Sequence, residues 1–124
     1  METGSETNMD KGLLNARNSV LYNLVSMSCG RISASHHALT YFVERDGADS
    51  RHRYVAELRG YVQEGTEEDI ELMQDIFDDV MVSVDIFGVA VHGHVIKNFT
   101  GALRLRQGER ATFQRYGFDI RHSE

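Results

Sequence analysis

The chain has 124 residues, of which 41% are hydrophobic and 26% charged, and its formal net charge is −6. This composition predicts one globular domain with a hydrophobic core, and the negative charge argues against broad nonspecific binding to nucleic acids. No apolar stretch is long enough to span a membrane, and the polar first ten residues lack the features of a secretory signal. Because Cys29 is the only cysteine, an internal disulfide and a cysteine-rich zinc site are excluded. We expect a cytoplasmic protein without a cofactor.

Residues 1–9 are expected to form a flexible tail, and residues 10–124 a single α+β domain. A helix is predicted from Asp10 to about Met27, because Asp10 suits the N-cap, apolar residues recur at helical spacing, and Gly30 follows its end. Two strands are predicted next, over 37–44 and 51–63. The Asp46–Gly47 pair signals a turn between them, so we expect a β-hairpin.

A second helix is predicted over 66–80. Thr66 and Asp69 approximate a capping box, and apolar residues recur on one face from Ile70 to Val80. The end of this helix is ambiguous, because the helical spacing continues beyond Val80 while β-branched residues alternate with polar ones over 82–86. We favour a helix that ends near Val80, followed by one or two strands through residue 96 with a bulge at Gly88.

A second hairpin is predicted near the end of the chain. Residues 101–106 and 111–120 alternate as strands, and residues 107–109 form the turn between them. The predicted order is therefore α-β-β-α followed by several antiparallel strands. This order indicates an α+β fold, a two-layer sandwich in which two helices pack on a mainly antiparallel sheet.

Charges are segregated along the sequence. Nine carboxylates and no basic residue occupy 64–85, whereas arginines dominate the strand-like segments on either side. The acids of the predicted helix form either the solvated face of an amphipathic helix or a docking surface for a basic partner. The candidate partner-binding residues are Glu67, Glu68, Glu71, Asp75, Asp78 and Asp79.

Two pairs of arginines lie two residues apart on predicted strands, which puts each pair on one strand face. The candidate anion-binding residues are Arg51, Arg53, Arg104 and Arg106. Guanidinium groups bind phosphate through paired hydrogen bonds. If the two strands lie close together, they make a site for RNA or a phosphorylated small molecule. The alternative is an exposed sheet face whose arginines pair with carboxylates.

His92 and His94 share one strand face, a spacing that suits two metal ligands. A nearby aspartate as third ligand would make a metal-dependent hydrolase, whereas hydrogen-bonded histidines are the simpler interpretation. We therefore assign no metal ligand and no catalytic residue. No nucleophile elbow, Walker loop or dinucleotide motif is present, so the sequence leans against an enzyme.

The sequence thus predicts a non-enzymatic binding protein, an inhibitor or regulator that acts through a charge-polarised surface. That surface consists of the acidic helix over 66–80 and the arginine-bearing hairpins. We also expect a homo-oligomer, because residues 80–96 are apolar on more faces than a small domain needs. The alternatives are binding of RNA or a phosphorylated small molecule through the arginine-bearing strands, and a metal-dependent hydrolase that uses His92 and His94.

Overall fold

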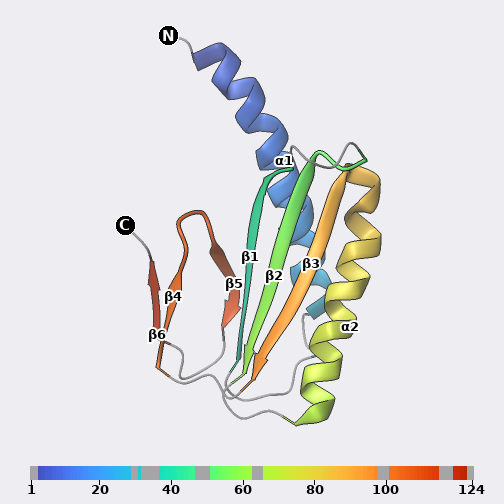
Figure 1. Cartoon of the computed structure of the whole chain (residues 1–124), viewed down its shortest axis with the longest axis vertical. Helices are drawn as coiled ribbons and strands as arrows, with labels where there is room; N and C mark the ends of the chain where they lie inside the picture. Colours follow the sequence, from blue (N-terminus) through green and yellow to red (C-terminus); the bar gives the residue numbers. More distant parts are fainter. Residues whose placement is uncertain are drawn as a thin grey trace.

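The computed structural model describes residues 3–28, 31, 37–46, 51–62, 66–97, 101–114 and 119–122. Two helices pack against a mainly antiparallel four-stranded sheet, which confirms the predicted α+β fold (Figure 1). In chain order the elements are α1 (Thr3–Ser28), β1 (His37–Arg45), β2 (Tyr54–Val62), α2 (Glu67–Val84), the 3₁₀ turn η1 (Asp85–Phe87), β3 (Val89–Lys97), β4 (Ala102–Leu105), β5 (Arg110–Gln114) and β6 (Asp119–His122). Neither helix in the described ranges combines the length and apolar character needed to cross a bilayer.

Helix α1 begins at Thr3, so it includes residues that the sequence assigns to the tail, and Asp10 lies inside the helix instead of capping it. Its first turns project past the end of the sheet in Figure 1. Farther along, Ala16, Val20 and Leu24 are buried at helical spacing in the core. The predicted helix end at Gly30 and the Asp46–Gly47 turn involve residues outside the described ranges.

The predicted hairpin of β1 and β2 is confirmed, with antiparallel pairing from His37 with Val62 to Arg45 with Tyr54. Strand β5 pairs antiparallel with β1, and β3 pairs in parallel with β2. A parallel pair needs a crossover connection, and α2 provides it. The strand order is β3-β2-β1-β5, so β3 is an edge strand of this sheet.

The predicted capping box at the start of α2 is confirmed. The Thr66 hydroxyl accepts a hydrogen bond from the Asp69 amide at 3.2 Å, and the Asp69 carboxylate accepts one from the Thr66 amide at 3.0 Å. These reciprocal bonds satisfy two amides that the first helical turn leaves without intrahelical acceptors. The start of the acidic helix is therefore defined by local sequence alone.

The predicted end of α2 is wrong. The helix continues to Val84, because Val80 and Val84 lie one turn apart and both are fully buried. After η1, Gly88 adopts a left-handed conformation with φ of 77°, and its amide donates to the Asp85 carbonyl at 3.0 Å. Gly88 thus ends the helical segment and is not a bulge. The chain then continues as the single strand β3.

The predicted hairpin near the end of the chain is also wrong. Strand β4 pairs in parallel with β6 in a separate two-stranded sheet, while β5 joins β1. Leu103 and Leu105 are buried against Ala38 and Tyr61, on the face of the large sheet opposite the helices. The turn between β4 and β5 instead directs Glu109 into the protein, where its side chain is 1% exposed. The burial of Leu103, Leu105 and Glu109 therefore places β4 and β5 in different sheets, although the polar–apolar alternation of their residues resembles that of a hairpin.

Two glycines let α2 pack closely on the sheet. A Cβ atom at Gly93 would lie 2.8 Å from Phe77 Cβ, and one at Gly60 would lie 2.8 Å from Met73 Sδ. Met73 and Phe77 are both buried in the main core. Glycine within a strand commonly marks such a close approach of another element.

We expect Gly93→Ala to lower the free energy of unfolding by about 1–3 kcal/mol, because the added methyl group overpacks the core next to the first side-chain atom of Phe77. Gly60→Ala is the matched control: it makes the same change in the neighbouring strand, but the crowded atom is near the flexible end of Met73. Equilibrium urea unfolding measures both losses. We expect a smaller loss for Gly60→Ala, and equal losses would contradict the assignment of Phe77 Cβ as the neighbour that can move less.

Candidate functional site

All six candidate partner-binding acids are exposed on the solvent face of α2. Two of them are paired: a Glu67 oxygen lies 3.7 Å from Lys97 Nζ, and an Asp79 oxygen lies 3.8 Å from Arg31 Nη1. The other four form no ion pair with any residue in the described ranges; they are Glu68, Glu71, Asp75 and Asp78. These four unpaired carboxylates extend over about 15 Å of helix.

The six acids fall into two rows along α2. The contact with Lys97 places Glu67 on the side of β3, and positions one and three turns farther along share that side. The β3-side row is Glu67, Glu71 and Asp78. The contact with Arg31 places Asp79 on the other side. The α1-side row is Glu68, Asp75 and Asp79.

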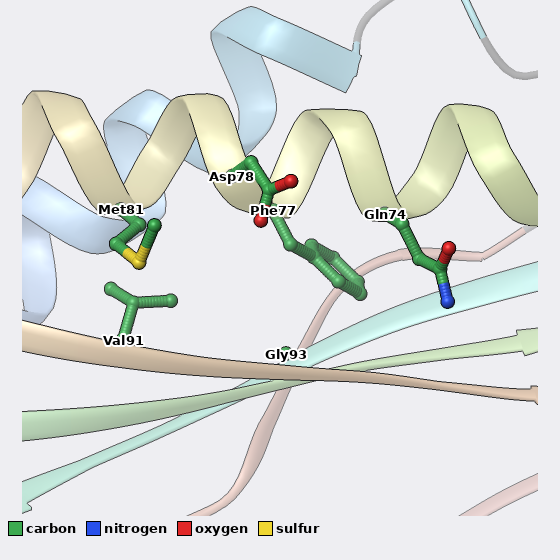
Figure 2. A pocket seen from close by; sticks show the side chains of 6 residues that line it. All are labelled: Gln74, Phe77, Asp78, Met81, Val91 and Gly93. Carbon is green, nitrogen blue, oxygen red and sulfur yellow. The ribbon is translucent and has the colours of Figure 1, made fainter.

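A groove of about 250 Å³ lies between α2 and the edge strand β3. It is lined by Gln74, Phe77, Asp78, Met81, Val91 and Gly93. Figure 2 shows Phe77 extending from the helix toward Gly93, with Gln74 and Met81 on either side of it along α2. The groove therefore has an apolar lining, and Asp78 of the β3-side row lies at its border.

The opposite face of the sheet carries a network of ion pairs centred on Arg106. Its Nη1 donates to Glu57 at 2.8 Å, while its Nε and backbone amide donate to the same Glu109 oxygen at 3.1 and 2.9 Å. The second Glu109 oxygen accepts from the Thr40 hydroxyl at 2.7 Å. The guanidinium also lies 4.8 Å from the centroid of the Phe42 ring. Arg106 is thus held by the protein's own carboxylates.

The surroundings of these carboxylates alter their protonation. Burial raises the pKa of Glu109, but hydrogen bonds from the Arg106 amide, Thr40 and the Arg106 guanidinium outweigh it, and the pKa lies below its ordinary value of 4.5. Burial also raises the pKa of Glu57. Hydrogen bonds and charge from Arg106 and Arg59 outweigh this effect, so the pKa lies below its ordinary value. Both carboxylates are therefore ionised at neutral pH.

The four candidate anion-binding arginines do not form one cluster of available guanidinium groups. Arg51 and Arg53 are exposed just before β2, where the Arg53 amide donates to the Gly88 carbonyl at 3.0 Å. Arg104 is exposed on β4, in the separate two-stranded sheet. Arg106 is bound to Glu57 and Glu109. The expected anion-binding surface stays a prediction.

His92 and His94 are exposed on β3, on the sheet face opposite α2. They line a hollow of about 280 Å³ together with Phe42, Glu44, Val55 and Glu57. His94 Nε2 lies 3.9 Å from a Glu57 oxygen, but Glu57 is already bound to Arg59 and Arg106. Within the described ranges no three His, Cys, Asp or Glu side chains are grouped so as to hold a metal ion.

Sequence reasoning missed the groove and the network of Arg106. The one sequence signal for the groove is Gly93, a glycine inside a β-branched segment, which commonly marks a close approach of another element. Glu109 carries no such signal, because a charged residue in a turn is ordinarily exposed. Its burial depends on Thr40, 69 residues away in the chain.

Comparison of the chain with protein-family models, with curated proteins and with solved structures gives no match. Function is therefore inferred from the residues and their geometry. The acidic face of α2 and the adjoining groove bring several exposed carboxylates without an ion pair in the described ranges next to a concavity.

We expect Glu109→Gln to lower the free energy of unfolding at pH 7 by about 1–3 kcal/mol, because a buried hydrogen-bonded charge opposite Arg106 is lost. Since the folded-state pKa of Glu109 is depressed, its contribution is present above about pH 4.5 and is lost as the pH falls through the lower folded-state value. The difference in the free energy of unfolding between variant and wild type should therefore become smaller at acidic pH. Urea unfolding at neutral and acidic pH measures it, with the exposed Glu44→Gln as control. A difference independent of pH would contradict this assignment.

Proposed function

We propose that this chain is a non-enzymatic protein-binding module, an inhibitor or regulator that docks a basic partner protein through the solvent face of α2. One observation carries the proposal: the two charged regions of the protein are neutralised to different extents. Arg59 and Arg106 are paired with Glu57 and Glu109. The carboxylates of α2 are exposed, and four of them have no ion pair in the described ranges.

The acids of α2 repel one another, and a basic partner would relieve this energetic cost. Glu71 and Asp75 lie four residues apart on α2, as do Asp75 and Asp79, and like charges at this spacing destabilise a helix by a few tenths of a kcal/mol per pair. A partner with lysines and arginines would replace this repulsion with attraction. It would also associate faster, because complementary fields steer the encounter.

The alternatives are supported less well by the geometry. RNA or a phosphorylated molecule would need available guanidinium groups, and Arg106 is already bound by two carboxylates. A metal-dependent hydrolase would need a third ligand near His92 and His94, and Glu57, which lies 3.9 Å from His94, is paired with two arginines. A basic partner bound at the acids of α2 requires neither available guanidinium groups nor a third metal ligand.

Self-association stays a prediction. The segment that suggested it exposes large apolar side chains in the last turn of α2 and in η1: Val82, Ile86 and Phe87 are 73%, 82% and 58% exposed. These three side chains follow the acids of α2 along the chain, and two roles fit them: extension of the partner contact, or pairing with a second copy. Subunit count decides between these roles.

The test is to neutralise the four unpaired acids together, as Glu68→Gln, Glu71→Gln, Asp75→Asn and Asp78→Asn. We expect wild-type protein, purified gently from its source cells, to retain a basic protein in native mass spectra, and the neutralised variant to lose it. The fold should remain intact, because all four side chains are exposed and removing their repulsion does not disturb the core.

The control is Glu44→Gln, which removes an exposed carboxylate from β1 and should retain the partner. Circular dichroism shows whether each variant is folded. Identical retained proteins for wild type and the neutralised variant would refute docking through α2. The same spectra report the number of subunits and therefore test the predicted homo-oligomer.

A further inference from the structure

The outer edge of β3 carries backbone groups that no strand in the described ranges pairs with. The Gly88 carbonyl accepts from the Tyr54 amide at 3.1 Å, and β3 then runs in parallel register with β2 from Val89 to Lys97. Because backbone groups alternate in direction along a strand, the even-numbered residues of β3 point their amides and carbonyls at β2. The odd-numbered residues, including Val91, Gly93 and Val95, point theirs outward. No strand in the described ranges occupies that side.

This edge lacks the usual features that prevent strand addition. Proteins commonly protect an edge strand with prolines, bulges, central charges or short length. Strand β3 has nine residues, an uninterrupted register with β2, and a single formally charged side chain, Lys97, at its end. At its centre Gly93 is exposed, so its outward amide and carbonyl are accessible. Val89 and Val91 are buried whereas Gly93 and Lys97 are exposed, so a fully extended segment can pair along the part of the strand around and after Gly93.

The groove defines what such a segment meets beside the backbone. Side chains of an added strand alternate, so every second one, about 6.8 Å from the next, faces α2. There it meets Met81 and Val91 on the groove wall, and Asp78 at its rim (Figure 2). Lysine and arginine suit this position, because their alkyl stems cover apolar surface while their charged ends reach carboxylates. Glu71 extends the same β3-side row by two turns.

Charge selects a basic segment over a second copy of this chain. If two copies paired through their β3 edges, their β3-side rows of acids would lie near one another across the junction. Juxtaposed like charges cost free energy and disfavour that pairing. A segment with basic residues at alternate positions gains from the same acids.

From these contacts we infer that the partner contributes an extended basic segment that adds as a strand to the outer edge of β3, with alternate basic side chains over the groove between β3 and α2. This inference rests on the proposed function and specifies the partner's bound conformation. Strand addition gives affinity through main-chain hydrogen bonds, and the groove with its acidic rim gives specificity.

The probe is a capped nine-residue peptide in which valine alternates with lysine or arginine. We expect binding to slow amide hydrogen exchange at Val91, Gly93 and Val95 by about tenfold or more, as measured by NMR. Exchange at Ala90 and His92 should change much less, because their amides already point at β2. The same peptide N-methylated along its backbone keeps the side chains but cannot donate, and should bind at least about tenfold more weakly.

Two variants of α2 with the same change in charge test which side of the helix contributes to peptide binding. Glu71→Gln with Asp78→Asn neutralises the β3-side row and should weaken the peptide by about fivefold. Glu68→Gln with Asp75→Asn makes the same change in the α1-side row and should weaken it less. All four side chains are exposed, so both variants should fold.

Several results would overturn strand addition. These are absence of binding at millimolar peptide, equal binding of the N-methylated peptide, or bound peptide without protection of Val91, Gly93 and Val95. Equal losses in the two variants would place the peptide across the outer face of α2, which overturns strand addition but leaves docking through α2 intact. The proposed docking through α2 fails only if the variant with all four acids neutralised retains the same protein as wild type.

Discussion

The arrangement of the whole surface depends on the contact between Phe77 and Gly93. A side chain at position 93 would lie 2.8 Å from Phe77 Cβ, so α2 takes its position over β3 because that side chain is missing. This contact holds the helix against the edge strand of the sheet. Helix α2 lies alongside β3 (Figure 1), and the Glu67–Lys97 contact puts the β3-side row of acids on the side of this edge strand, where no described strand pairs. Packing thus brings together a groove, an accessible edge and unpaired negative charge.

Burial determines which charges are neutralised. Glu109 is almost wholly buried, and a buried carboxylate is stable only when it is paired and hydrogen-bonded, so it binds Thr40 and Arg106. Arg106 in turn binds Glu57. Water solvates the carboxylates of α2, so the fold itself does not require them to be paired. Arg59 and Arg106 on the sheet face are therefore paired internally, whereas the six acids on the solvent face of α2 are exposed.

Features set by neighbouring residues were predictable from the sequence, and features set by tertiary contacts were not. The capping box of Thr66 and Asp69 and the exposed acids of α2 follow from local spacing. The end of the same helix was missed, because Val84 has a spacing that suits either structure and only its burial selects the helix. The alternation of residues 102–105 and 110–114 indicates two strands but not which strands they pair with. One partner of Arg106, Glu57, lies 49 residues away in the chain, and the other, Glu109, is held in place by Thr40, 69 residues away, so the neutralisation of Arg106 could not be foreseen.

The most direct test of docking beside β3 is hydrogen–deuterium exchange of the protein with its retained native partner, compared with the free protein. We expect partner-dependent protection in β3 and in the part of α2 that borders the groove, from Glu71 to Met81, with little change in β5 and β6. Protection confined to the two-stranded sheet or to α1, with unchanged exchange in β3 and α2, would contradict the proposed binding surface.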